Sequence, residues 1–122
     1  MIEFLSSRPN LEIDGLAPGA AFLRELPGFE IEVDEPQIGL VLLRRDAVGL
    51  ALVRSASPGA NATTAAYLEV TGVDDLHGRC LARGARIVPG LADHPRGLRD
   101  FVTQMPGGHQ VAPGEQITNH PG

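Results

Sequence analysis

The feature that most constrains the fold of this 122-residue chain is a short sequence that occurs twice. Leu-Glu-Ile-Asp-Gly-Leu at residues 11–16 returns as Leu-Glu-Val-Thr-Gly-Val at residues 68–73. In both copies apolar residues alternate with other residues, which is typical of a short β-strand, and a glycine then precedes a helical pattern. The repeat predicts two modules with the same order of elements.

Each copy of the repeat is followed by a predicted helix and by a glycine that ends it. In the first half a helix is expected over residues 17–26, because Pro18 is tolerated only in a first turn and a Pro-Gly pair follows. In the second half apolar residues recur at helical spacing from Val73, and Gly84 marks the end.

Three strands are expected after each helix. Residues 29–33 alternate cleanly and match residues 85–88 in the second half. Residues 39–44 and 48–54 form a predicted hairpin, and residues 97–112 form its counterpart around a Met-Pro-Gly-Gly turn. Each half therefore reads as strand, helix, strand, strand, strand.

The predicted fold is α+β, with two tandem βαβββ modules in one domain. Module one spans about residues 4–56, a linker of small and polar residues spans 55–64, module two spans about 65–115, and a tail spans 116–122. The last strand is expected to end at Pro113. A sheet with a single helix cannot bury both faces, so the modules are expected to pack together, within one chain or between two, around a cleft between curved sheets.

Charge and composition exclude several classes of function. The net charge of −5 argues against nucleic acid as a partner, and no apolar run approaches the ~20 residues of a membrane span. The single cysteine, Cys80, excludes an internal disulfide. The amino-terminal sequence lacks the pattern of a signal peptide, so a cytoplasmic protein is expected.

The order and spacing of these motifs resemble the vicinal oxygen chelate superfamily of glyoxalases, extradiol dioxygenases and bleomycin-resistance proteins. The strongest match is Arg-Gly-Leu-Arg-Asp-Phe at residues 96–101 with Met-Pro-Gly-Gly at 105–108; family members often have an aromatic residue before Gly-Leu-Arg-Glu-Phe, and then Asp-Pro-Asp-Gly. Residues 70–76 resemble the start of the family's second helix, and residues 22–29 resemble its Phe-Tyr-x-x-Leu-Gly-Phe motif. The resemblance spans about residues 8–115.

The resemblance also implies where a metal would bind. Metal-dependent members carry His or Glu on the first and last strands of each module, and these positions fall on residues without normal metal-binding groups: Ser7, Ala51, Ala65 and Ala112. The four histidines are expected on unrelated elements: His77 on the second helix, His94 in a loop, His109 at the hairpin turn and His120 in the tail. No metal and no other cofactor is therefore expected.

Larger side chains near these small residues are the candidates for ligand contact. Alternation from Ala65 and Ala112 turns Tyr67 and Gln110 toward the cleft, although a strand tyrosine is also compatible with the core. Phe101 is a further candidate whose alternative is core packing, and the alternative for the two hairpin arginines is a solvated cation. The expected cleft comprises Ser7, Ala51, Ala65, Tyr67, Arg96, Arg99, Phe101, Gln110 and Ala112.

The resemblance implies a metal-free protein of the bleomycin-resistance type, which sequesters a small molecule, an antibiotic among the candidates, and forms a homodimer. Four Phe, one Tyr and no Trp favour a ligand smaller or less aromatic than bleomycin. One alternative is a lyase or dioxygenase of the superfamily with displaced metal ligands or with metal-independent chemistry through Tyr67 and the arginines. A third is a module that serves only dimerisation or regulation.

Overall fold

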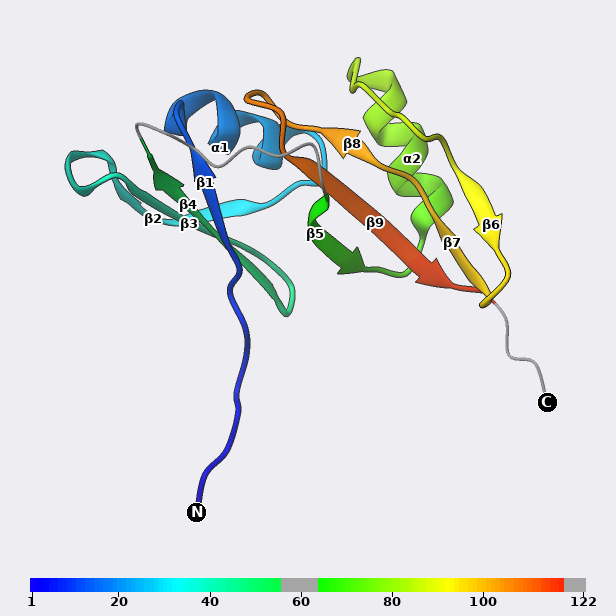
Figure 1. Cartoon of the computed structure of the whole chain (residues 1–122), viewed down its shortest axis with the longest axis horizontal. Coiled ribbons are helices and arrows are strands. Elements are labelled where there is room, and N and C mark those ends of the chain that lie inside the picture. The colour runs from blue at the N-terminus through cyan, green and yellow to red at the C-terminus, as the bar shows by residue number, and fades with distance from the viewer. Residues whose placement is uncertain (56–63, 118–122) are drawn as a thin grey trace. The chain divides into compact units, whose positions relative to one another are not determined.

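The structure is a computed structural model that describes residues 1–55 and 64–117, with the backbone alone for Thr64 and Ala65. It divides into two compact units, Met1–Ala60 and Asn61–Gly122. Each unit contains a β-sheet and one α-helix of ten residues (Figure 1). Unit 1 has the predicted order of strand, helix and three strands, whereas unit 2 has four strands after its helix.

Unit 1 begins with an extended segment that leads into the first strand. Its elements are β1 (Asn10–Ile13), α1 (Leu16–Glu25), β2 (Glu30–Glu35), the short 3-10 helix η1 (Pro36–Ile38), β3 (Leu40–Arg45) and β4 (Val48–Arg54). Sheet A has the order β1-β4-β3-β2, with β1 parallel to β4 and the other pairs antiparallel. The predicted helix and hairpin of the first half are confirmed to within a residue or two.

The core of unit 1 lies between α1 and one face of sheet A. Leu11 pairs with Leu52, and Leu52 pairs with Val41 on the next strand, so a row of apolar side chains crosses the sheet. Leu23 on α1 is 0% exposed and belongs to the same core. Burying a leucine of this kind contributes about 1.5–3 kcal/mol, which makes this row the main support of the unit.

Unit 2 repeats the arrangement with a more interrupted sheet. Its elements are β5 (Thr64–Glu69), α2 (Val73–Ala82), β6 (Ala92–His94), β7 (Leu98–Asp100), β8 (Thr103–Gln104) and β9 (Gln110–Gln116). Sheet B has the order β5-β9-β7-β6, with β5 parallel to β9, and β8 also pairs with β9. The hairpin turn of Met-Pro-Gly-Gly is present, with positive φ at Gly107 and Gly108.

Two predictions for unit 2 are wrong: the strand at residues 85–88 and the placement of His94 in a loop. Residues 85–88 form no strand beyond an isolated bridge between Ile87 and Thr103. The first strand after α2 is instead β6, which ends at His94, so His94 lies on a strand and not in a loop. The pairing around this bridge is short: the Val88 N–H donates to the Val102 carbonyl at 3.0 Å, and the Arg86 carbonyl accepts from the Gln104 N–H at 3.1 Å.

The last strand does not end at Pro113 but continues to Gln116. The sheet accommodates the proline because the facing chain is interrupted where the missing N–H would be needed: β7 ends at Asp100 and β8 begins at Thr103. The Pro113 carbonyl still accepts a hydrogen bond from the Phe101 N–H at 3.3 Å. Gln116 is therefore part of sheet B, and the rest of the predicted tail, residues 118–122, lies outside the described residues.

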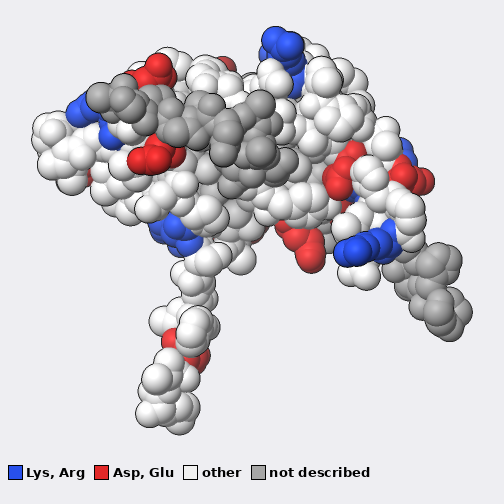
Figure 2. Space-filling view, viewed as in Figure 1, with Lys and Arg blue, Asp and Glu red and all other residues white. Residues whose placement is uncertain are grey.

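The beginning of the segment before β1 extends away from sheet A and carries few charged side chains (Figure 2). Met1, Ile2, Phe4 and Leu5 are between 83% and 118% exposed. Ser7 is exposed in this segment, and the β1 residue opposite Ala51 is Asn10. The expectation that Ser7 lies on the first strand is therefore wrong.

None of the helices within residues 1–55 and 64–117 has the length and apolarity that crossing a membrane requires.

Candidate functional site

Tyr67 lies on the face of sheet B that α2 does not cover, called here the open face of sheet B. Its neighbours on β5, Ala66 and Leu68, are 7% and 6% exposed, whereas Tyr67 is 46% exposed. Ala112 on β9 lies directly opposite Tyr67, and Gln110 shares its face by alternation along β9. Three of the predicted cleft residues, Tyr67, Gln110 and Ala112, are thus brought to one face of unit 2.

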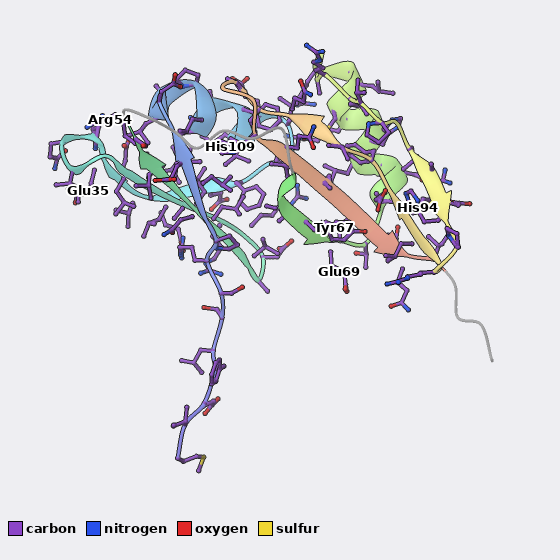
Figure 3. The ribbon with its side chains drawn as sticks, viewed as in Figure 1. Glu35, Arg54, Tyr67, Glu69, His94 and His109 are labelled. Atoms are coloured by element: carbon purple, nitrogen blue, oxygen red, sulfur yellow. The ribbon has the colours of Figure 1, made fainter. Side chains whose placement is uncertain are left out.

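The Tyr67 hydroxyl takes part in a hydrogen-bonded group that reaches across the sheet. It donates to Asp100 Oδ2 at 3.1 Å, and His94 Nε2 lies 2.7 Å from the other carboxylate oxygen, Oδ1. An ionised carboxylate carries no proton, so Tyr67 and His94 both act as donors. The three residues come from β5, β7 and β6, and Figure 3 labels the two at its ends. We refer to them as the Tyr67–Asp100–His94 group.

Gly114 provides the space that lets Tyr67 reach Asp100. It lies on β9 directly opposite Asp100, between the strands that carry the two side chains. A Cβ at this position would overlap the Tyr67 hydroxyl and the ring carbon that bears it, and would lie 3.1 Å from the Asp100 Cβ. The tyrosine ring therefore lies over the backbone of β9, and only glycine leaves room for it.

The surroundings of Tyr67 keep its phenol protonated. Burial raises the pKa of Tyr67, and the hydrogen bond to Asp100 and the negative charges of Asp100 and Glu69 raise it further. Glu69 is exposed two residues along β5 and projects from the same strand as Tyr67 (Figure 3). The result is a neutral hydrogen-bond donor beside two carboxylates.

Arg99 and Phe101 do not share this face, because Asp100 between them on the chain occupies it. Arg99 points toward α2, where its Nε donates to Asp74 at 2.7 Å and its Nη1 donates to Asp93 at 2.6 Å. These two hydrogen bonds raise the pKa of Arg99. Phe101 is 0% exposed and packs edge-on against His77 of α2, with ring centroids 5.0 Å apart. Arg99 ties α2 to the sheet, and Phe101 is a core residue.

The remaining predicted cleft residues are dispersed. Arg96 is exposed in the turn between β6 and β7, and Ser7 lies in the segment before β1. Ala51 lies on β4 and is 2% exposed. The side chain of Ala65 lies outside the described residues, although its backbone belongs to β5.

Unit 1 carries a cluster of charged residues on the face of sheet A opposite α1. Glu32 accepts hydrogen bonds from Arg8 Nη2 at 2.8 Å and from Arg44 Nε at 3.2 Å, and Arg8 also donates to the Leu43 carbonyl. A Cβ at Gly49 would lie 3.3 Å from the Arg8 guanidinium carbon, so glycine lets Arg8 lie close to β4. The cluster joins the segment before β1 to β2 and β3.

We expect Glu32→Gln to lower the melting temperature by roughly 1–4 °C at neutral pH. The hydrogen bond from Arg8, together with the charges of both arginines, holds the pKa of Glu32 below its usual value. A carboxyl with a lowered pKa stabilises the fold above its usual pKa and loses this effect as the pH falls through the lowered value. The difference between the two proteins should therefore vanish in acid, as thermal melts at several pH values would show. Glu30→Gln, which removes a neighbouring carboxylate without an ion pair among the described residues, is the control and should lower the melting temperature less.

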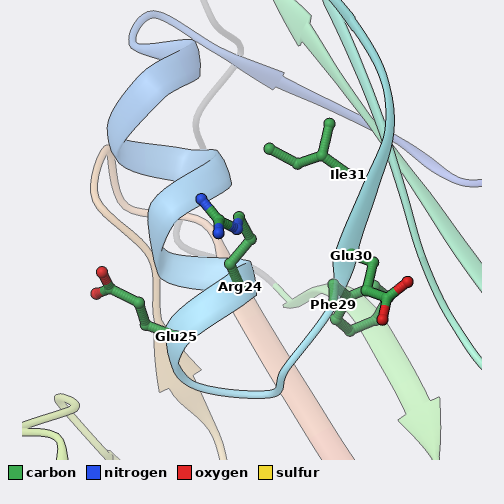
Figure 4. A pocket seen from close by; sticks show the side chains of 5 residues that line it. All are labelled: Arg24, Glu25, Phe29, Glu30 and Ile31. Carbon is green, nitrogen blue, oxygen red and sulfur yellow. The ribbon is translucent and has the colours of Figure 1, made fainter.

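Unit 1 also contains a surface hollow of about 430 Å³ beside the end of α1. Arg24 lies between α1 and β2, and Glu25 and Glu30 point away from it on either side (Figure 4). Phe29 and Ile31 complete the lining. No sequence motif predicted this hollow.

Sequence reasoning also missed His94, Asp100 and Gly114 of the open face. Gly114 carried a signal, because a glycine inside a strand often marks the close approach of another group to the backbone. Asp100 and His94 carried none, since their proximity depends on how β6, β7 and β9 pair.

The described residues do not supply a metal centre. No three His, Cys, Asp or Glu side chains among them gather at one point. Ala51 and Ala112, two of the positions that bind metal in the family resembled, have no donor atom in their side chains. Tyr67, Asp100 and His94 offer hydrogen bonding and a flat ring surface instead.

Comparisons with known proteins identify the fold. No protein-family model matches the chain, and no curated protein sequence matches it. Solved structures do match. The bleomycin-binding protein of bleomycin-producing Streptomyces verticillus, in complex with copper(II)-bleomycin, has a TM-score of 0.76 at 23% identity, over 98% of this chain and 100% of that one. TnmS3, an antibiotic-binding protein from Streptomyces sp. CB03234, has a TM-score of 0.79 at 19% identity, over 95% and 98%. Lactoylglutathione lyase from Agrobacterium tumefaciens has a TM-score of 0.72 at 20% identity, over 88% and 90%.

Proposed function

We propose, from the premise that this chain has the glyoxalase/bleomycin-resistance fold, that it binds a small molecule on the open face of sheet B and catalyses no reaction on it. The observation that carries the proposal is the chemistry of the positions where metal-dependent members place His or Glu. Ala51 and Ala112 cannot hold a metal, and the described residues supply no substitute cluster. A homodimer is part of the proposal, since the family resemblance implies one.

The aromatic residues bear on the kind of ligand. Phe22, Phe29 and Phe101 are at most 9% exposed, and Phe4 lies in the segment before β1. Tyr67 is the only tyrosine, and the chain has no tryptophan. Stacking on the open face of sheet B therefore depends on one ring, which supports a ligand with a single ring system rather than one with several.

The test is ligand binding followed by thermal shift and calorimetry, with copper(II)-bleomycin as the first probe and single-ring-system antibiotics as the others. A ligand at 100 times its Kd should stabilise the native protein by about 2.7 kcal/mol. Tyr67→Ala should weaken binding by about tenfold, which corresponds to about 1.4 kcal/mol. Phe4→Ala, which removes an aromatic ring outside the sheets, is the matched control and should bind as the parent does. Binding that is unaffected by Tyr67→Ala would place the ligand elsewhere and contradict the proposal.

A second candidate function is an enzyme of the same fold, and the observation that favours it is the Tyr67–Asp100–His94 group. Tyr67 and His94 are side chains of the kinds that enzymes use for proton transfer, and Asp100 joins them by hydrogen bonds. Formation of lactoylglutathione from methylglyoxal and glutathione, with and without added Zn²⁺ or Ni²⁺, tests this function. Turnover that is lost in Tyr67→Phe would replace the binding proposal with the enzymatic one.

A further inference from the structure

We propose that Asp100 and His94 are positioning residues, which hold Tyr67 across Gly114 as a fixed flat surface, and that this surface binds a planar cation. The inference rests on the proposed function, because it concerns the chemistry of the same face. It assigns roles to Asp100 and His94, and it specifies the charge of the ligand, which Tyr67 alone would not indicate.

The geometry restrains Tyr67 at both ends of its side chain. The backbone of β5 fixes one end, and the hydrogen bond to Asp100 Oδ2 at 3.1 Å fixes the hydroxyl two strands away. Gly114 lies beneath, and its lack of a Cβ lets the ring lie close to the sheet. The side chain is nevertheless 46% exposed, so part of the ring remains open to a ligand. A ring that is already oriented loses little conformational entropy on binding.

His94 acts one step further from the ligand. Its Nε2 lies 2.7 Å from Asp100 Oδ1, and the Asp100 side chain is 18% exposed. With Oδ1 bonded to His94, the other oxygen, Oδ2, is directed to Tyr67. His94 therefore sets the orientation of the carboxylate, and the carboxylate sets the orientation of the ring.

The charges near Tyr67 select the sign of the ligand. Asp100 and Glu69 both act electrostatically on the phenol, and Glu69 forms no ion pair with any described residue. Arg99 lies on the opposite face of the sheet, where it pairs with Asp74 and Asp93. A planar cation would gain a cation–π interaction with the ring and attraction to the two carboxylates, and a planar anion would be repelled.

Tyr67 can be followed directly, because it is the only tyrosine and no tryptophan obscures its absorbance. Asp100→Asn removes the charge that helps to raise the pKa of Tyr67, so the phenol should titrate at lower pH than in the parent, with the effect of burial remaining. His94→Gln should shift the titration less. Asp93→Asn, on β6 but on the other face, is the control and should leave the titration unchanged. A tyrosine titration that is the same in parent and Asp100→Asn would overturn the positioning role.

The ligand chemistry is tested with two dyes that share a planar core of three fused rings, proflavine as the cation and fluorescein as the anion. Fluorescence anisotropy should show that proflavine binds the parent about tenfold more tightly than fluorescein does, and that Asp100→Asn and Gly114→Ala each weaken proflavine by about tenfold. Equal binding of both dyes, or proflavine binding that Gly114→Ala leaves intact, would overturn the inference.

A double variant separates displacement of Tyr67 from general damage to the fold. Gly114→Ala should lower the melting temperature of the parent. It should have a much smaller effect in a Tyr67→Ala background, where the overlap with the tyrosine ring is gone and only the Asp100 Cβ, 3.1 Å away, remains close. Equal losses in both backgrounds would show that the clash is not with Tyr67. The outcomes also separate the two proposals: loss of all ligand binding with the expected tyrosine titration contradicts the proposed function alone, whereas antibiotic binding with an unchanged titration contradicts the positioning role alone.

Discussion

Phe101→Ala is expected to lower the free energy of unfolding of unit 2 by about 3–5 kcal/mol. Phe101 is 0% exposed and contacts His77 of α2 edge-on at a centroid distance of 5.0 Å. Its removal leaves a cavity between α2 and the interrupted part of sheet B, where β7 has ended and β8 has not begun. Urea denaturation followed by circular dichroism measures the loss, and the whole of a typical domain's stability is only about 5–15 kcal/mol.

Leu81→Ala is the matched control, because Leu81 lies on α2 and is 55% exposed. It should change the stability by less than about 0.5 kcal/mol. If Phe101→Ala were as mild as Leu81→Ala and instead abolished ligand binding, the assignment of Phe101 to the core would be wrong and the ligand-contact alternative would be right.

Local patterns predicted most elements of this fold. Alternation over residues 29–33 depends on which side chains one sheet face buries, and the helical spacing after Val73 depends on one apolar stripe. Both patterns are therefore visible within a few residues. The repeat then predicted that each unit begins with a strand followed by a helix. These predictions do not depend on which strands pair with each other in the folded sheet.

The errors arose where the structure depends on distant partners. β9 continues past Pro113 because the interruption between β7 and β8 removes the need for a proline N–H, and no local rule contains that compensation. Arg99 and Phe101, chosen for the cleft, flank Asp100 on the chain and lie on the other face from Tyr67. Since successive side chains in a strand point to opposite faces, this choice selects the α2 face and passes over Asp100.

The candidate site was predicted in part for the same reason. Tyr67, Gln110 and Ala112 follow from alternation on two strands that the repeat identifies. Asp100 and His94 join them only because sheet B has the order β5-β9-β7-β6, which sets the distances between their side chains. A hydrogen-bonded group that spans three strands leaves no periodic signal in the sequence.

Cys80 should react with Ellman's reagent at least about a thousandfold more slowly in the native protein than in denaturing urea. It is the only cysteine, it lies on α2, and it is 1% exposed. Burial raises the pKa of its thiol, against a smaller opposing effect of Arg79 and Arg83, so little thiolate is present. Because the thiol is buried and protonated, α2 must separate from the core before Cys80 can react. The reaction rate therefore reports the opening of unit 2.

The control for this reactivity is Leu81→Cys in a Cys80→Ala background, which puts the thiol at the adjacent, 55% exposed position. That thiol should react at nearly the rate of a free thiol without unfolding. Phe101→Ala, which destabilises the same core, should accelerate the reaction of Cys80 by roughly 100-fold or more, since each 1.4 kcal/mol is a factor of ten. Rapid reaction of native Cys80, or a rate that Phe101→Ala leaves unchanged, would contradict the packing of α2 against sheet B through these two side chains.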